Sequence, residues 1–293
     1  MKIVRFKGGL GNQMFQYAFA KLLECTFQEE VKLDFSAYSS LMDDPIRQPR
    51  LLKYNLSLPI ATKSEVNNIC LFPHFGNSQS NFYRFQILLE KIFNRNYFFE
   101  KNRDFLDINM IGKYCFYDGY WQSYKYIEAV SDIIINDFVP KVDLSNQTLQ
   151  FIEYVKNSPT TFVGIRRGDF LDEQEHYGAI SNDYYLNAMG LITSKYPNTN
   201  FLIFTNDVEW CKNNMNFANY HVEYREKCMQ VDDFDELMIM RSCQNAIISN
   251  STFNWWGAYL IDNPEKMVVC PETWFIDDKP INIIPDSWIK MKR

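Results

Sequence analysis

The chain of 293 residues has no stretch that approaches about 18 uninterrupted apolar residues, so the sequence predicts no transmembrane helix. Its N-terminus runs from Met1 directly into a short strand-like segment, without the apolar core of a signal peptide. We therefore expect a cytoplasmic protein that has at most peripheral contact with the inner face of the plasma membrane.

Cysteine and histidine are too scattered to predict a disulfide framework or a metal site. The seven cysteines include no C-x-x-C pair, and the three histidines stand far apart. Asp233-Phe234-Asp235 resembles the Asp-x-Asp of metal-dependent sugar transferases, but it begins an amphipathic helix, where acidic residues complement the helix dipole. We therefore expect no metal ion and no other cofactor.

Long basic runs are also missing, and the net charge of −6 argues against a nucleic-acid binder. A small anionic ligand is still compatible with this charge, because two well-placed arginines suffice for a diphosphate. With 46% hydrophobic residues, a chain of this length can bury a sizeable core, as a globular enzyme does.

Strands and helices alternate along the chain, most regularly in its second half, and this is typical of parallel β-α-β packing. We therefore predict an α/β fold of two Rossmann-like lobes, at residues 1–150 and 151–293. Residues 36–110 are interrupted by prolines and stay unassigned apart from one helix. The predicted strands are 3–6, 31–35, 114–120, 161–165, 201–204, 221–224, 246–249 and 267–270, and the predicted helices are 12–25, 81–93, 124–138, 182–195, 207–214, 251–260 and one that begins at Asp233.

Two adjacent arginines, Arg166 and Arg167, follow the predicted strand at 161–165. Ligands of open parallel sheets bind beyond the carboxyl ends of the strands. Guanidinium groups bind phosphate oxygens bidentately and stay charged at any physiological pH. The pair is therefore a candidate diphosphate site; the alternative is a surface pair neutralised by Asp169.

Two further turns join a strand to a helix. The helix at 251–260 begins among small polar residues, so its N-terminus can offer N–H groups to an anion, unless it is the ordinary cap of a core helix. Gly8-Gly9-Leu10-Gly11-Asn12-Gln13 has neither the dinucleotide fingerprint nor the P-loop spacing. That turn either reverses the chain or presents its amides to a sugar.

Taken together, these motifs resemble the bacterial α-1,2-fucosyltransferases of glycosyltransferase family 11. The similarity extends in the family's order from residue 8 to about residue 275, and it is weakest over residues 36–110. It rests on the stretches GGLGNQMFQYA at 8–18, GYWQS at 119–123, IRRGD at 165–169, FTNDVEW at 204–210 and IISNSTFNWWGA at 247–258.

The resemblance implies a two-lobed glycosyltransferase of the GT-B type that inverts the anomeric carbon and requires no metal. The donor site would lie in the C-terminal lobe, and the diphosphate of GDP would be held by Arg166 and Arg167. The remaining residues carried over by position are Asn250, Ser251, Thr252 and Phe253 around the donor, and Asn12 and Gln13, which would face the reacting sugars from the other lobe.

One position departs from the family pattern. Many members have His where this chain has Gly164, so an imidazole at that position cannot be the general base here. The base is left unassigned; the acceptor hydroxyl would need only weak assistance, for which Asp169 and a phosphate oxygen of the departing GDP are the candidates.

The implied reaction is transfer of L-fucose from GDP-L-fucose to the 2-hydroxyl of a β-galactoside. The acceptor would be a galactose-containing oligosaccharide or lipid-linked glycan of a bacterial O-antigen or capsule. Two alternatives stay open, namely a transferase for another nucleotide sugar and a non-catalytic nucleotide-sugar-binding protein. No nucleic-acid partner is expected.

Overall fold

The computed structural model describes residues 1–38, 48–72, 81–101, 105–167, 178, 180–217, 219–225, 232–276 and 282–293. The chain forms two compact units. Unit 1 comprises Met1–Val142 and Ile281–Ile283, and unit 2 comprises Asp143–Pro280 and Ile284–Arg293. The sequence placed the boundary between residues 150 and 151, which lies inside helix α7 (Asn146–Asn157), whereas the division falls between Val142 and Asp143.

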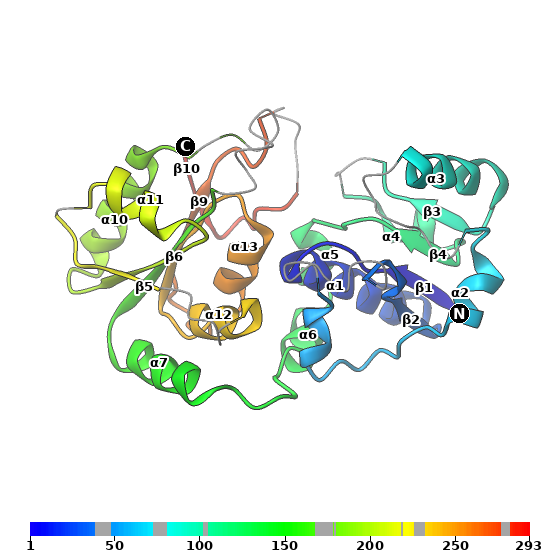
Figure 1. Cartoon of the computed structure of the whole chain (residues 1–293), viewed down its shortest axis with the longest axis horizontal. Coiled ribbons are helices and arrows are strands. Elements are labelled where there is room, and N and C mark those ends of the chain that lie inside the picture. The colour runs from blue at the N-terminus through cyan, green and yellow to red at the C-terminus, as the bar shows by residue number, and fades with distance from the viewer. Residues whose placement is uncertain are drawn as a thin grey trace. The chain divides into compact units, whose positions relative to one another are not determined.

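Unit 1 contains a parallel sheet with the strand order β2-β1-β4-β3 (Figure 1). Because β2 lies on one side of β1 and β4 on the other, the chain changes direction across the sheet between β1 and β4. The long helix α1 (Leu10–Phe27) packs against β1 and β2. The strands are β1 (Lys2–Arg5), β2 (Val31–Asp34), β3 (Tyr97–Phe99) and β4 (Phe116–Asp118).

The other helices of unit 1 are short, apart from α3 (Asn81–Phe93), whose bounds agree with the prediction. The single helix predicted over 124–138 is two helices, α5 (Tyr124–Glu128) and α6 (Ser131–Asp137). Strand β3 and several short helices lie in the segment that the sequence left unassigned. The remaining elements are η1 (Ser36–Tyr38), η2 (Arg50–Lys53), α2 (Lys63–Ile69) and α4 (Ile108–Ile111).

Unit 2 contains a six-stranded sheet with the order β10-β9-β8-β5-β6-β7, and every pairing in it is parallel. Numbered within the unit, this is the order 3-2-1-4-5-6 of dinucleotide-binding folds. The direction of winding reverses between β5 and β8. The strands are β5 (Thr160–Ile165), β6 (Asn200–Thr205), β7 (Val222–Tyr224), β8 (Asn245–Ile247), β9 (Val268–Pro271) and β10 (Ile289–Met291).

In the described part of unit 2, four helices besides α7 follow the strands as the sequence predicts. They are α10 (Asn182–Lys195), α11 (Val208–Asn214), α12 (Asp233–Met240) and α13 (Thr252–Tyr259). The N-cap of α12 is Asp232, one residue before the predicted start, and its carboxylate accepts from the N–H groups of Phe234 and Asp235. Helix α7, which the sequence did not predict, packs against α12.

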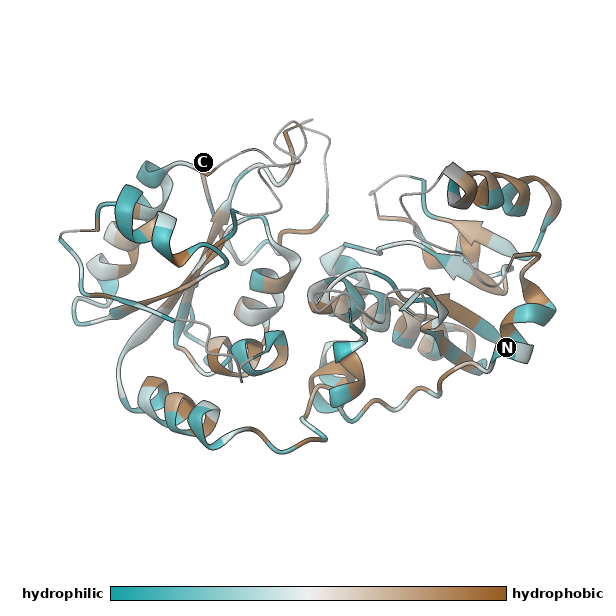
Figure 2. Cartoon of the chain, viewed as in Figure 1, coloured by the Kyte–Doolittle hydropathy of each residue, from teal (hydrophilic) through white to brown (hydrophobic). Residues whose placement is uncertain are grey.

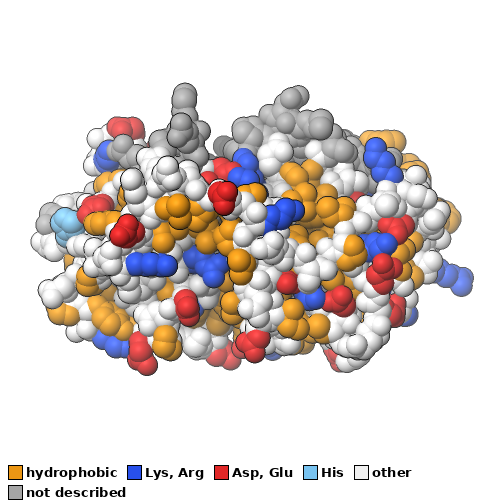
Figure 3. Space-filling model, turned by 90° about the horizontal axis from the view of Figure 1, so that it is seen from below, with side chains coloured by type: hydrophobic (Ala, Val, Ile, Leu, Met, Phe, Trp, Pro, Cys, Tyr) orange, Lys and Arg blue, Asp and Glu red, His pale blue; other side chains and the backbone are white. Residues whose placement is uncertain are grey.

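The distribution of hydrophobic residues agrees with this layered packing. Brown and teal residues alternate along α7 in Figure 2, as expected of a helix with one face on another helix. On the face drawn in Figure 3, side chains of both signs are interspersed. Within the described ranges, no helix is long and apolar enough to cross a membrane.

The two parallel sheets and the helices that follow their strands confirm the predicted α/β class.

Candidate functional site

Three loops meet at the carboxyl edge of the unit 2 sheet, the edge at which its parallel strands end. β5 is paired with β6 on one side and β8 on the other, so the residues that follow these three strands lie next to one another. Ligands of doubly wound sheets bind at this edge where the winding reverses. In unit 2 that point lies between β5, which leads into Arg166, and β8, which leads into Asn250.

Arg167 is held in place by the loop that follows β6. Its backbone N–H donates to Oδ1 of Asn206 (3.0 Å), and its guanidinium carbon lies 3.3 Å from the centroid of the Trp210 ring. Nε lies 3.8 Å from Oδ2 of Asp207, whose other oxygen accepts from the N–H of Trp210 at the start of α11. The planar fork is therefore stacked and oriented before any ligand is present.

The two arginines are both half-buried and belong to the same turn. The Nε–H of Arg167 is buried and, in the described part of the chain, has no hydrogen-bond partner, since the carboxylate of Asp207 is beyond hydrogen-bond distance. Asp169, the third residue predicted to take part in catalysis, lies outside the described residues.

The N-terminus of α13 lies on the other side of the reversal point. Ser251 is its N-cap, but the Ser251 side chain makes no capping hydrogen bond. Asn250 is buried and its amide donates to the carbonyl of Trp274 (2.9 Å), while Thr252 and Phe253 are half-buried. The N–H groups of a first helical turn have no partners within the helix, so this terminus can receive an anion beside the arginines.

Gly164 fits against a buried asparagine. A Cβ at this position would lie 2.2 Å from Nδ2 of Asn254, whose amide donates to the Ser249 hydroxyl (2.9 Å). The Ser249 N–H in turn donates to the Gly164 carbonyl (3.1 Å). Asn254 thus fills the space that a side chain at position 164 would need.

Unit 1 has a similar contact between a glycine and an asparagine at its own reversal point, between β1 and β4. Gly8 has a left-handed φ of +82°, and a Cβ on it would lie 2.5 Å from the Asn12 amide. Asn12 is half-buried in the first turn of α1, and its Oδ1 accepts from Nε2 of Gln122 (2.8 Å), which follows β4. The two loops are therefore joined across the point between β1 and β4.

Gln13, unlike the half-buried Asn12, is not accessible to a sugar. Its side chain is completely buried, Nε2 donates to the carbonyls of Gly8 (3.1 Å) and Gln48 (2.7 Å), and Oε1 accepts from the N–H of Leu51 (3.0 Å). Both ends of its amide are used inside the protein, so Gln13 fixes the glycine turn to the segment before η2.

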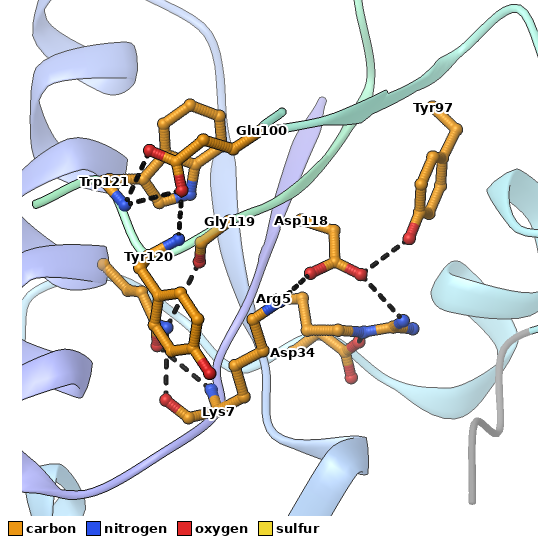
Figure 4. A network of polar contacts seen from close by, with 10 residues as sticks. Arg5, Lys7, Asp34, Tyr97, Glu100, Asp118, Gly119, Tyr120 and Trp121 are labelled. Atoms are coloured by element: carbon orange, nitrogen blue, oxygen red, sulfur yellow. Dashed lines mark hydrogen bonds and ion pairs between the residues drawn. The ribbon is translucent and has the colours of Figure 1, made fainter. Parts of the chain in front are cut away.

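A network of buried charges lies at the carboxyl edge of the unit 1 sheet (Figure 4). Asp118 at the end of β4 is fully buried and accepts from Lys7 Nζ (2.6 Å), Tyr97 Oη (2.6 Å) and Arg5 Nη1 (3.4 Å). Arg5 also contacts Asp34 at the end of β2 (3.3 Å). Burial alone would raise the pKa of Asp118, but the charges of Lys7 and Arg5 and the hydrogen bonds from Lys7 and Tyr97 lower it overall.

The loop after β4 is held in a strained conformation (Figure 4). The Glu100 carboxylate accepts from the backbone N–H groups of Tyr120 (2.6 Å) and Trp121 (3.2 Å), and Trp121 has φ 56° although it is completely buried. The Tyr120 side chain, by contrast, is 42% exposed, and Lys7 Nζ lies 4.8 Å from its ring centroid. A strained backbone conformation that is held by surrounding contacts is typical of functional loops.

No group of three or more His, Cys, Asp or Glu residues that could hold a metal occurs among the residues that the structure describes. The Asp-x-Asp segment has structural roles there. Asp233 and Asp235 lie in the first turn of α12, and Oδ1 of Asp235 accepts from the Thr148 hydroxyl (2.8 Å).

The site residues that sequence reasoning missed are Asn206, Asp207 and Trp210. All three follow β6, the next strand after β5 along the chain, which pairs with β5 in the sheet. The motif that contains them was noticed only as part of the family resemblance. A polar residue directly after a neighbouring parallel strand is the signal that would have found them, once the strand order was known.

The chain belongs to glycosyl transferase family 11, whose family model matches residues 1–289. It is 31% identical to the O-antigen biosynthesis glycosyltransferase WbnK of Escherichia coli over 97% of this chain and 98% of that protein. It is also 26% identical to the alpha-1,2-colitosyltransferase of Escherichia coli over 99% of each chain. The protein is therefore a glycosyltransferase.

The fold is also similar to that of a solved fucosyltransferase. The crystal structure of POFUT1 in complex with GDP-fucose superimposes with a TM-score of 0.52 over 92% of this chain and 97% of that one, at 14% sequence identity. This likeness concerns the fold alone.

We predict that Gly164→Ala lowers the free energy of unfolding by about 1–3 kcal/mol, because the new methyl group displaces Asn254 from Ser249. A double-mutant cycle by chemical denaturation checks this. In the Asn254→Ala background the same change should cost clearly less, since the clashing amide is gone. Additive costs would contradict the contact.

We also predict that Asp118→Asn lowers the free energy of unfolding at pH 7 by about 3–5 kcal/mol, because it removes the counter-charge of Lys7 and one of the two counter-charges of Arg5. Since the folded pKa of Asp118 is lowered, its contribution is present above the unfolded pKa of about 4 and is lost as the pH falls toward the folded pKa.

Denaturation of the wild type and the variant between pH 7 and pH 3 measures this dependence. The variant should lose less stability over that range than the wild type, whereas the exposed control Asp143→Asn should follow the wild type. Equal pH dependence of Asp118→Asn and wild type would show that Asp118 is not ionised in the network.

Proposed function

We propose that this glycosyltransferase is an inverting α-1,2-fucosyltransferase, which moves L-fucose from GDP-L-fucose to the 2-hydroxyl of a β-galactoside in a bacterial surface glycan. The observation that carries the proposal is the pair Arg166 and Arg167 opposite the N-terminus of α13, at the reversal point of a dinucleotide-type sheet. Family membership supports it.

In this proposal unit 2 is the donor lobe of a two-lobed GT-B enzyme. The diphosphate of GDP lies between the two guanidinium groups and the first turn of α13, where both fixed charges and helix N–H groups face it. Ser251, Thr252 and Phe253 contact the donor directly. Asn250 supports the turn through its hydrogen bond to Trp274.

The proposed reaction is a single displacement with inversion. The acceptor O2 forms a bond to the anomeric carbon of fucose from one face, while the bond from that carbon to the GDP oxygen breaks on the other. The electron pair leaves with GDP, and Arg166 and Arg167 stabilise the charge that grows on the diphosphate. The acceptor proton passes to Asp169 or to a phosphate oxygen, and no metal ion is required.

Unit 1 is the acceptor lobe in this proposal. Asn12, which is half-buried and bonded to Gln122, supplies amide groups to sugar hydroxyls, and the exposed ring of Tyr120 offers an apolar face for a pyranose. Gln13 acts indirectly, by fixing the glycine turn that presents Asn12.

The acceptor is a galactose-containing oligosaccharide or a lipid-linked glycan of an O-antigen or capsule, and transfer takes place in the cytoplasm. Similarity to an O-antigen biosynthesis glycosyltransferase over nearly the whole chain supports this assignment. Similarity to an alpha-1,2-colitosyltransferase supports the 1,2-linkage and makes colitose the second candidate for the transferred sugar.

A donor comparison tests the proposal. Purified protein is given GDP-fucose, the colitose donor or a UDP-hexose, each with a β-galactoside and with or without excess EDTA. A fucosylated product whose linkage is 1,2 by NMR, formed equally with EDTA, supports the proposal. Preference for the colitose donor would show that colitose, and not fucose, is the transferred sugar. Binding of GDP without any transfer would indicate a non-catalytic nucleotide-sugar-binding protein.

We expect Arg166→Ala to lower kcat by about 100-fold or more, because one main donor to the charged leaving group is lost. Steady-state kinetics at saturating donor measures this effect, with Lys156→Ala, an exposed residue of α7, as the control that leaves kcat unchanged. Near-normal turnover of Arg166→Ala would remove this arginine from the mechanism.

We expect Tyr120→Ala to raise the KM for the acceptor by about tenfold, because the apolar sugar face loses its aromatic contact, while the KM for the donor stays unchanged. Tyr120→Phe should behave like the wild type. A change in donor KM alone would contradict the placement of Tyr120 in the acceptor site.

A further inference from the structure

Helix α3 turns its large apolar side chains outward. Five of them are exposed by between 51% and 67%, which is unusual for residues of this size in a soluble fold. At 100° per residue they fall within a stripe about 140° wide along one side of the helix. These residues are Phe82, Phe85, Leu88, Ile92 and Phe93.

The opposite side of α3 is buried and partly polar, so the orientation of the helix is fixed by specific contacts. Glu90 is completely buried, with Oε1 accepting from the N–H of Phe72 (2.8 Å) and Oε2 from the Asn94 amide (2.8 Å). Ile87 packs against Phe72 and Phe99. Rotation that would bury the apolar stripe instead would break the hydrogen bonds of Glu90.

Cations lie beside this stripe, although the chain as a whole is acidic. In the described segment 81–101, both acidic residues, Glu90 and Glu100, accept hydrogen bonds from other groups of the protein, and neither is exposed. The basic residues of that segment are all exposed. They are Arg84, Lys91, Arg95 and Lys101.

Two of these basic residues, Lys91 and Lys101, lie close enough to interact. Partial burial and the positive charges of Lys101 and Lys7 lower the pKa of Lys91. On the helix, Arg84 and Lys91 fall beside one edge of the apolar stripe, where long basic side chains can extend toward an interface while the apolar residues enter it.

We propose that α3 binds in the interface of an anionic lipid membrane, with its apolar stripe among the upper acyl chains and its basic residues at the headgroups. An exposed apolar helix face flanked by cations and without exposed acids has the charge complementarity that such a surface requires. With 13 residues, α3 is about 20 Å long and lies along the surface.

The inference goes beyond the proposed reaction. It rests on the proposed function in one respect only: unit 1, which carries α3, is also the proposed acceptor lobe. Membrane binding by α3 would then bring that lobe to the surface where a lipid-linked glycan is found.

Vesicle co-sedimentation tests the proposal. Wild-type protein is mixed with vesicles of phosphatidylcholine alone or with phosphatidylglycerol, in the absence of donor and acceptor. We expect binding to the anionic vesicles that weakens as salt rises. Phe85→Ser/Ile92→Ser should lower the partition coefficient by at least about tenfold, and Arg84→Glu/Arg95→Glu should abolish the preference for anionic vesicles.

The matched control is Leu149→Ser/Lys156→Glu on α7, whose substituted residues are also exposed, and it should bind as the wild type does. Circular dichroism and transfer to a soluble acceptor should be unchanged in every variant, so a loss of vesicle binding is separable from unfolding and from failure of the proposed reaction.

Three outcomes would overturn the proposal. The wild type could fail to bind anionic vesicles, or the α3 variants could bind as well as the control. In the third outcome, the wild type binds no vesicles and is a dimer by sedimentation velocity, and Phe85→Ser/Ile92→Ser converts this dimer to a monomer. A second copy of the chain would then cover α3.

Discussion

The candidate donor site depends on the parallel pairing of β5 with both β6 and β8. Because all three strands end at the same edge, residues that are far apart in sequence are brought around one point. Arg167 obtains its orientation from Asn206, Asp207 and Trp210 after β6, and α13 begins directly after β8. A change in strand order would separate these groups even if every strand and helix were retained.

In unit 1, too, parallel strands end at one edge of the sheet, but the side chains at this edge form a buried ionic network. In this network, Asp118 and Asp34 neutralise Lys7 and Arg5 (Figure 4). The loop after β4 is fixed by Glu100 and leaves the Tyr120 ring at the surface. The charges here fix the positions of the loops, whereas in unit 2 we propose that the arginines bind the donor diphosphate.

Much of this could be predicted from the sequence, because strand and helix periodicity is a local property. The bounds of α3 and α10 agree with prediction, and Arg166 and Arg167 follow a strand as expected. Non-local features could not be predicted in this way. The burial of Gln13 depends on the segment around Gln48, and the contacts of Arg167 depend on which strand lies beside β5.

Amide hydrogen exchange with and without saturating GDP tests most directly whether the donor nucleotide binds at the reversal point of the unit 2 sheet. A site formed by the two arginines and the α13 terminus predicts slower exchange in segments 164–167, 206–210 and 250–254, with unit 1 unchanged. Protection confined to the glycine turn at residues 8–13, or none in the three segments, would contradict that placement.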